Sequence, residues 1–581
     1  MDQTKRMMLA VALSFGLITA WTFLFPQAKP EAPVATTEKT EAPKPVEEAV
    51  VPTMEAPSPV AAPERARPPL TTVKVQRDEV HYELSTQGAS MTHAELQGVK
   101  MKEAQELSFK QGLDKLLGKP VPTPSQMDMA VVAAGQPQPF SLSIIGDAPF
   151  SDTAVYAVEE KPFQLSFTAQ EGAWEVVKTL TWKNEGFEFG YDIELRNKSD
   201  APLKGELVLH SVLGVDPSKE QAPSMLGGLG NQARATCFVD DSLKHLVPQN
   251  EVQKETFTGP MRFFGIDQTY FLAAIYPLDQ ARVGRCDLLA GPTARRADAA
   301  FPIEVGAGQS LKLPFGVFIG PKDAELLSRV SAVTGGAAKE GAAYRPQLEK
   351  SIDFGMFEII CRLLLAIMKV FYGWTGNWGV AVILLTVGVK LVLVPLTHKS
   401  MVAAENMKKL QPQMEDIRKK FVNDKERQNL EMMKLYQEAK VNPLGGCLPL
   451  LLQMPVWIAL FTTLRTSYEL YREPFYGALY SDLTAKDPIY LLPLLLGVSM
   501  VVTQKLQPQM MDATQAALMT WFMPIMFTAL MLQYPSGLTL YIFTNNILSI
   551  AQQFLLKKYL EKKGVASPPP KASKAWAKGK A

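Results

Sequence analysis

The sequence predicts a polytopic α-helical membrane protein that also carries a large all-β domain. Long apolar runs, sufficient to cross a bilayer, fill the C-terminal part of the chain. The segment before them alternates apolar and polar residues with the period of two that strands require. Basic residues gather in some connecting segments and avoid others, as in proteins with several membrane spans.

Composition excludes several classes of function. The 581 residues leave room for several domains, and 60 basic against 58 acidic side chains give no global field for nucleic acid. The four cysteines form no CxxC pair, so we expect no metal site. No nucleotide-binding loop of the form GxxxxGK[ST] occurs in the sequence, and we expect no cofactor. Cys237 and Cys286 fall in a segment that we place outside the cytoplasm, where they form either a disulfide or two free buried thiols.

The first segment, residues 1–25, contains an apolar run at 7–25 after Lys5 and Arg6. A cleavable signal peptide is one interpretation. We favour an uncleaved transmembrane anchor, because bulky Trp21 stands where small residues should prepare cleavage. Residues 26–70 are rich in proline and alanine and predict an extended tether.

Residues 71–345 predict a large β-sandwich. Apolar residues alternate with polar ones in several runs, as in strands with one buried face. These apolar residues are Val73, Val75, Val80, Tyr82, Leu84, Phe187, Phe189, Tyr191, Ile193 and Leu195. No apolar span interrupts the segment, so it lies wholly on one side of the membrane.

The β domain shows no catalytic pattern. Its histidines are scattered without the spacing of a metal site or a triad, and we interpret them as structural: His81, His93, His210 and His245. We therefore predict that the protein is not an enzyme. A carbohydrate-binding role remains an alternative, because β-sandwiches often bind sugars.

Residues 350–373 combine an apolar core with several charges, which predicts an amphipathic helix in the membrane interface, or else a buried helix. Residues 376–397 predict the next transmembrane helix, with Lys390 well inside it. A lysine there costs about 3 kcal/mol. The later apolar runs contain no acidic residue, so Lys390 either extends to the headgroups or faces a water-filled groove.

Residues 398–441 predict a helical hairpin outside the membrane. Apolar residues recur at helical spacing in both arms, at Met407, Leu410, Met414, Ile417, Phe421, Leu430, Met433 and Tyr436. This stripe is either the seam of the hairpin or an adaptable surface for apolar partners.

Residues 442–556 predict transmembrane helices 3–6. Gln453 adds a polar side chain to the third. The last is unusually polar, with Asn545 among its polar groups, and some of these groups must face the bundle interior. Residues 557–581 form a lysine-rich tail that could contact anionic lipid or RNA phosphate. The basic hairpin and tail predict cytoplasmic loops, and six spans place both termini in the cytoplasm.

Two stretches carry a resemblance to a known family. NPLGGCLPLLLQMPVW at 442–457 and YPSGLTLY at 534–541 resemble the hallmark stretches of the YidC membrane protein insertases, and the likeness extends over the whole chain. The resemblance implies a periplasmic β-supersandwich in a Gram-negative inner membrane. It also implies a five-helix core around a hydrophilic groove that opens to cytoplasm and lipid.

The resemblance assigns candidate groove residues one by one. Lys390 matches a groove cation that is usually arginine, so the charge is kept and the bidentate fork is lost. Thr386 lies one helical turn earlier on the same face. Met454 and Pro455 match client-contacting positions, and Tyr541 matches the first of two adjacent aromatics, the second being Ile542 here.

The family implies nascent membrane proteins as clients and the Sec translocon as a partner. It also implies ribosomes, which we assign to the basic tail and cytoplasmic loops, and membrane lipids, without a specific nucleic-acid sequence. A secondary transporter is the rival class. The absence of intramembrane carboxylates and of an evident inverted repeat in the sequence argues against it.

Overall fold

The computed structural model describes most of the chain beyond the proline-rich segment. The described residues are 70–103, 107–133, 135–183, 185–217, 232–246, 252–278, 281–330, 345–422, 424–439, 448–475, 480–506 and 518–562. The predicted anchor at 1–25, the tether and the end of the basic tail lie outside this part. The same holds for Asn442 and the two glycines that follow Pro443.

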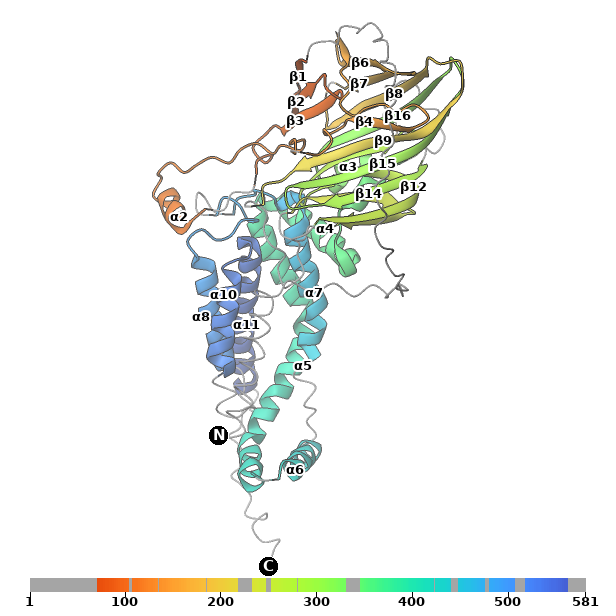
Figure 1. Ribbon diagram of the computed structural model, residues 1–581. Coiled ribbons are helices and arrows are strands. Elements are labelled where there is room, and N and C mark those ends of the chain that lie inside the picture. Colours follow the sequence, from red (N-terminus) through yellow and green to blue (C-terminus); the bar gives the residue numbers. More distant parts are fainter. Residues whose placement is uncertain are drawn as a thin grey trace, which may run out of the picture. The chain divides into compact units, whose positions relative to one another are not determined.

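The β domain contains two sheets (Figure 1). The small sheet has the order β1-β2-β3, formed by β1 (Thr72–Gln76), β2 (Val80–Ser85) and β3 (Ser90–Leu96). The large sheet has the order β4-β9-β15-β14-β12-β13-β16-β8-β7-β6-β5, and β10 and β11 branch from β12. Its pairings are antiparallel, so the large β-sandwich region expected from the sequence is present.

The strands of the large sheet have the following bounds. They are β4 (Leu142–Gly146), β5 (Ala157–Lys161), β6 (Gln164–Glu171), β7 (Trp174–Trp182), β8 (Glu188–Asn197), β9 (Leu203–Gly214), β10 (Arg234–Val239), β11 (Ser242–Leu246), β12 (Gln253–Asp267), β13 (Phe271–Pro277), β14 (Arg282–Ala290), β15 (Ala294–Val305) and β16 (Ser310–Pro321).

Alternation in the sequence explains how these strands pack. In β2, Val80, Tyr82 and Leu84 are buried and the residues between them are half-buried. In β8 the buried positions include Phe189, Tyr191, Ile193 and Leu195. Both sets belong to one continuous hydrophobic core of the domain, which confirms the strands predicted there.

Cys237 and Cys286 meet inside this core as free thiols. Both side chains are fully buried, one on β10 and the other on β14. Burial and then the neighbouring Cys237 thiol raise the pKa of the Cys286 thiol well above its usual value. The structure therefore corresponds to two free buried thiols, one of the two arrangements that the sequence left open.

The helices lie mostly in the C-terminal part of the chain. They are α2 (Phe109–Leu116), α3 (Ala324–Arg329), α4 (Glu358–Thr375), α5 (Trp378–Lys420), α6 (Lys425–Glu438), α7 (Leu448–Thr466), α8 (Leu491–Leu506), α10 (Met523–Met531) and α11 (Ser536–Lys562). Short 3₁₀ turns occur at η1 (Leu348–Ser351), η2 (Gly355–Phe357) and η4 (Tyr468–Leu470), and η5 (Leu518–Phe522) is π-helical and leads into α10.

Helix α4 is apolar on two faces. One face is buried through Cys361, Leu364, Leu365 and Met368. A second stripe is exposed to solvent or lipid, at Met356 in the preceding turn and at Ile359, Leu363, Val370 and Trp374. Arg362 and Glu358 form an ion pair beside that stripe. A helix with this pattern suits the interface of a bilayer.

Helix α5 continues without interruption from the apolar span into the predicted hairpin. It runs through Pro395 and Pro412 and ends at Lys420, and α6 follows as the second arm (Figure 1). Met414 is buried, and the Tyr436 hydroxyl donates to its sulfur at 3.8 Å. Leu430 and Met433 are more than half exposed, so only part of the apolar stripe forms the seam.

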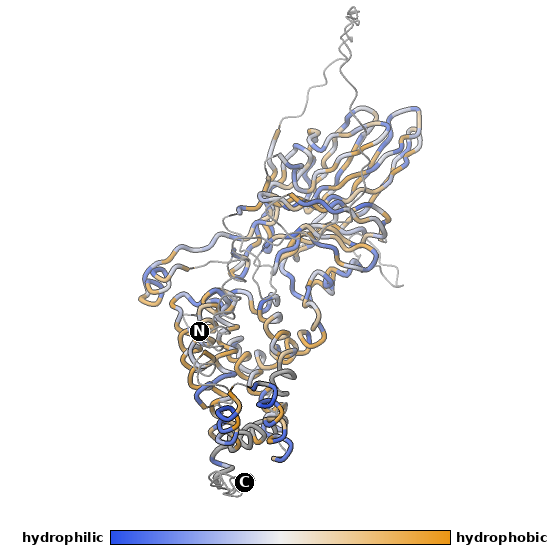
Figure 2. Tube along the Cα trace, turned by 60° about the horizontal axis from the view of Figure 1, so that its bottom comes forward, coloured by the Kyte–Doolittle hydropathy of each residue, from blue (hydrophilic) through white to orange (hydrophobic). Residues whose placement is uncertain are grey.

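Helices α5, α8, α10 and α11 pack against one another. Helix α11 contacts both α5 and α8, and α8 contacts α10. Gly497 on α8 permits a close approach to α10, because a Cβ there would clash with the Thr528 hydroxyl. Figure 2 shows hydrophobic residues along most of the helical bundle and hydrophilic ones near its lower end.

One described helical segment, Trp378–Pro395, is long and apolar enough to cross a membrane. Two further segments, Leu491–Leu506 and Leu518–Met531, are apolar but shorter. The count of six spans stays a prediction.

Candidate functional site

Lys390 lies where α5 packs against α11. Its Nζ donates a hydrogen bond to Ser549 Oγ at 2.8 Å, and Ser549 Oγ in turn donates to the Asn545 carbonyl at 2.8 Å. The Ser549 hydroxyl therefore joins the cation to the backbone of α11. Lys390 and Ser549 are 159 residues apart in the chain, so these hydrogen bonds connect two helices that are distant in sequence.

Lys390 has no acidic partner in the part of the chain that the structure describes. No carboxylate there forms an ion pair with its ammonium group. Two buried cations of the β domain do have one, since Arg234 and Lys322 both pair with Asp267, the latter at 2.6 Å. A cation in an apolar setting without a counter-ion is available to an acidic group from another molecule.

A pocket of about 520 Å³ opens beside Lys390. One wall comes from α5 and the other from α11, and each contributes residues at the spacing i, i+3, i+4, i+7 and i+11 that marks one helical face. The lining residues are Val387, Lys390, Leu391, Val394 and His398 of α5, and Leu548, Ala551, Gln552, Leu555 and Tyr559 of α11. Among the described lining residues the pocket is thus mostly apolar, with Lys390 as its fixed cation.

Further toward the C-termini of α5 and α11, polar groups connect the two walls of the pocket. Gln552 Nε2 donates to Thr397 Oγ1 at 2.7 Å, and the rings of His398 and Tyr559 meet edge to face with centroids 6.2 Å apart. Leu391 and Leu555 remain about two-thirds exposed on the walls. An extended or helical apolar segment could reach the pocket from the side.

The candidate residues from the sequence do not all gather at this pocket. Asn545 is linked to Lys390 through Ser549. Thr386 is buried and donates to the Val382 carbonyl of its own helix at 2.7 Å, and Tyr541 is buried in the hydrophobic cluster of the helices. Neither of these two lines the pocket.

The candidates on α7 also lie apart from it. Met454 is 45% exposed and Pro455 is half-buried, inside a helix that continues through the proline. Gln453 belongs to the same helix, but its side chain lies outside the described part of the structure. These residues form a second group rather than a continuation of the pocket wall.

Sequence reasoning did not select the pocket residues His398, Gln552 and Tyr559, nor Ser549, which bonds Lys390. A signal existed, because Asn545, Ser549 and Gln552 follow one another at helical spacing along a single face. The face of α5 that meets α11 repeats this spacing, beginning at Lys390. Only the pairing of the two helices reveals that the faces meet.

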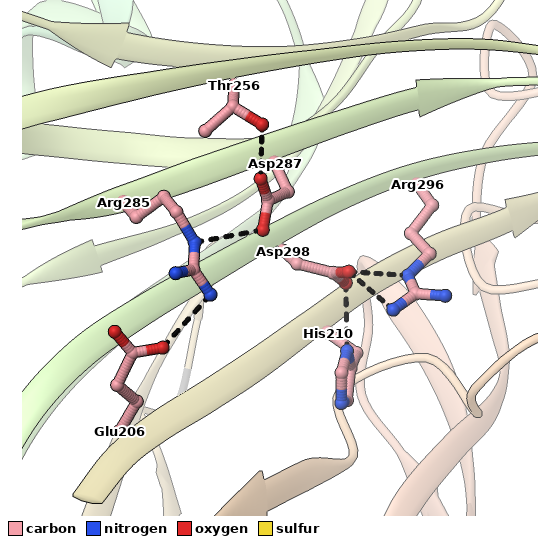
Figure 3. A network of polar contacts seen from close by, with 7 residues as sticks. All are labelled: Glu206, His210, Thr256, Arg285, Asp287, Arg296 and Asp298. Carbon is pink, nitrogen blue, oxygen red and sulfur yellow. Dashed lines mark hydrogen bonds and ion pairs between the residues drawn. The ribbon is translucent and has the colours of Figure 1, made fainter. Parts of the chain in front are cut away.

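In the β domain, a row of polar residues crosses four strands in register. Thr256, Asp287, Asp298 and His210 stand opposite one another on β12, β14, β15 and β9. Figure 3 shows how arginines neutralise the two aspartates: Arg285 bonds Asp287 and Glu206, and Arg296 bonds Asp298. The network combines ion pairs within β14 and β15 with cross-strand contacts from Arg285 to Glu206 and from His210 to Asp298.

His210 occupies the buried end of this row. Its Nδ1 lies 2.8 Å from Asp298 Oδ1, and its Nε2 lies 3.2 Å from the Ser143 hydroxyl. Burial raises the pKa of Asp298, but hydrogen bonds from His210 and Arg296 outweigh it and leave that pKa below its usual value.

A serine, a histidine and an aspartate in this order occur in hydrolases, where an oxyanion hole completes the site. Ser143 instead lies within the β4–β9 ladder, opposite Val208, where strand pairing engages the backbone. His93 likewise bonds Asp128, while His245 Nδ1 has no partner among the described residues. Among these residues no group of three potential ligands could hold a metal ion.

Comparison with known proteins identifies the family. Residues 370–563 match the model of the 60Kd inner membrane protein, and residues 72–367 match that of the YidC periplasmic domain. A protein of Anaeromyxobacter dehalogenans (strain 2CP-C), named membrane protein insertase YidC, is 37% identical across 98% of this chain and 99% of its own. A protein of the same name from Geobacter metallireducens is 31% identical across 95% and 98%.

A crystal structure of an active YidC insertase with its first transmembrane domain resolved aligns with 84% of this chain and 94% of its own, at 19% identity and a TM-score of 0.36. The family models and the relatives' names describe an inner-membrane protein with a periplasmic domain, and none of them names an enzyme. The relatives' name, membrane protein insertase, agrees with the expectation that the protein is not an enzyme. On the two family models, which together span residues 72–563 with a short gap, and on its full-length relatives, the chain belongs to the YidC family.

Proposed function

We propose that this protein inserts membrane proteins into the bacterial inner membrane, and that the pocket between α5 and α11 receives the polar segment of a client. The observation that carries the proposal is Lys390, which bonds Ser549 and has no carboxylate partner among the described residues. The names of the full-length relatives support the general activity.

The proposed mechanism lowers the barrier for a client's polar tail. Lys390 attracts acidic residues of the tail while the apolar part of the client leaves sideways into lipid. Burial of an apolar helix gains about 25 cal/mol for each Å² removed from water. Summed over the surface of a whole helix, this gain exceeds the free energy of a single ionic contact many times over. The hydrophobic effect therefore drives release, and the sequence contains no GxxxxGK[ST] loop for nucleotide.

The exposed Met454 on α7 and the pocket wall of α11 offer two surfaces to the departing helix. Methionine suits this role, because its flexible thioether adapts to apolar partners of different shapes. The exposed apolar stripe on α4 would rest in the periplasmic interface and keep the bundle at a fixed depth.

Topology and partners complete the proposal. Basic residues concentrate in the hairpin and the tail, which places both segments in the cytoplasm. With six helices spanning the membrane, both termini then face the cytoplasm. The same basic segments would bind ribosomes through RNA phosphate, and anionic lipids. The Sec translocon would share clients that carry large translocated domains.

The test replaces Lys390 with Ala or Arg in cells depleted of their native insertase. The readout is membrane insertion of a single-span client with a short acidic tail. Lys505 is a matched control, because it also lies on a bundle helix but rests over the ring of Trp521, 5.2 Å from its centroid. Insertion should fail with Lys390→Ala and persist with Lys390→Arg and Lys505→Ala. Normal insertion with Lys390→Ala would remove the cation from the mechanism.

A further inference from the structure

A segment of the β domain contacts the connection between α7 and α8. We call residues 97–103 and 107–121 the arm; they follow β3 and include α2. We call residues 467–475 and 480–490 the α7–α8 loop. Three separate groups of contacts join the arm to this loop, although about 370 residues of chain separate them.

The first group is formed by two consecutive residues of the loop. The Tyr471 hydroxyl donates to the Lys102 carbonyl at 2.6 Å, and Arg472 Nη1 donates to the Glu103 carbonyl at 2.9 Å. Tyr471 is fully buried, with its ring centroid 4.3 Å from that of Tyr270 in the β domain. The loop thus inserts an aromatic side chain into the core of the domain.

The second group is ionic. Lys100 of the arm forms an ion pair with Glu473 of the loop and lies over the ring of Tyr468, 5.9 Å from its centroid. Glu473 is mostly buried and Lys100 about one-third exposed, so water screens this pair less than a surface pair.

The third group involves α2, the helix of the arm. Ser108 and Gln111 form a capping box that defines its start. Phe109 stacks on Tyr490 with centroids 6.0 Å apart, and Gly112 rests on Pro488. A Cβ on Gly112 would lie 2.6 Å from Pro488 Cβ and 2.7 Å from its carbonyl oxygen. Only glycine permits this approach.

Backbone strain coincides with these contacts. Arg472 and Tyr490 are non-glycine residues with φ of 54° and 59°, in the left-handed region that costs about 1 kcal/mol or more. Both belong to the loop, and both touch the arm. Strained residues persist where surrounding contacts hold them, so the arm is positioned to hold the loop in this shape.

The loop in turn connects the ends of several helices. The Phe475 carbonyl accepts from Asn377 Nδ2, beside the start of α5, at 2.9 Å. The Leu483 carbonyl accepts from the Gly537 amide at the start of α11, at 2.8 Å. Asp487 Oδ2 accepts from the Leu492 amide at the start of α8, at 2.7 Å. The loop therefore fixes three helix ends at once.

We propose that the arm is a clasp that holds the α7–α8 loop against the helix ends, so that the β domain stabilises the end of the helical bundle at which this loop lies. The clasp is an intramolecular device and does not depend on the insertase activity proposed above. It gives the β domain a mechanical role: release of the arm loosens the loop while the sandwich stays folded.

Hydrogen exchange on the purified full-length protein tests the clasp. Gly112→Leu should push α2 off Pro488, and Phe109→Ala should remove the stacked ring from Tyr490 in a milder way. Lys110→Ala is the matched control, because Lys110 is an exposed residue of the same helix. The readout is exchange of peptides that cover 480–490 and the amides of Ser536 and Gly537, which bond the loop.

The clasp predicts at least about tenfold faster exchange in these peptides for Gly112→Leu and a smaller increase for Phe109→Ala. Peptides from β8 and β13 should exchange as in the unaltered protein, as should all peptides of Lys110→Ala. Unchanged exchange at 480–490 in both arm variants would overturn the clasp. Because no client is present, this outcome leaves the insertase proposal untouched, and failure of the Lys390 test leaves the clasp untouched.

Discussion

The Lys390 ammonium group lies 2.8 Å from the Ser549 hydroxyl, and this contact joins α5 to α11 at the pocket. A neutral hydroxyl leaves the positive charge uncompensated, whereas a carboxylate at that position would neutralise it. We therefore predict that Ser549→Asp inhibits insertion of an acidic client about as strongly as Lys390→Ala. Ser549→Asn is the isosteric control and should insert normally. Full activity with Ser549→Asp would show that the charge of Lys390 is not used.

Client contacts should follow the pocket walls. A photoreactive amino acid at Leu391 or Leu555 should cross-link to a stalled client, because both side chains are about two-thirds exposed beside Lys390. Ile359 on α4 is the control, since it is 85% exposed but lies outside the pocket. Equal cross-linking at Ile359 would mean that clients touch any exposed apolar residue.

Lys178 should make the stability of the β domain depend on pH. Its ammonium is fully buried and donates to the Gly88 and Phe140 carbonyls at 2.6 and 3.2 Å. Burial lowers the pKa of Lys178 from 10.5 to about 7. The unfolded chain then binds the proton more tightly, so the free energy of unfolding rises between pH 7 and 10.5, by on the order of 5 kcal/mol.

Urea unfolding of the full-length protein at several pH values, with proteolysis of the β domain as the readout, measures the slope of the free energy of unfolding against pH. Lys178→Met should flatten it over the same pH range. It should also remove three hydrogen bonds, so the comparison concerns the slope and not the absolute stability. An identical slope in the variant would assign the pH dependence to other groups.

The cysteines should react as free thiols once the protein unfolds. Cys237 and Cys286 are fully buried, and the folded protein should protect both from a maleimide. In denaturant without reductant, all four cysteines of the chain should be alkylated. A mass that corresponds to two modifications, rising to four after reduction, would instead show a disulfide.

The sequence predicted the strands well where one face is buried. The period of two in β2 and β8 reports directly which side chains enter the core. The sequence did not reveal that the span at 376–397 and the first arm of the hairpin belong to one helix. No glycine separates the two segments near residue 397, and α5 continues through Pro395 and Pro412 to Lys420.

The candidate site was only partly predictable, for a physical reason. Lys390 stands out because a charge inside an apolar run is costly, which a single sequence can reveal. Ser549 does not stand out, because its role depends on how α11 faces α5. Thr386 shares a helical face with Lys390 in sequence, but it is buried toward the bundle while the longer lysine extends to the pocket.

A charge exchange between the insertase and its client tests the central claim most directly. Lys390→Glu should block insertion of a client whose tail carries an aspartate, and should restore insertion when that aspartate is replaced by lysine. The unaltered protein should show the opposite preference. This result would establish that Lys390 acts on the client's charge. Failure of Lys390→Glu with both clients, or normal insertion of both, would contradict the account.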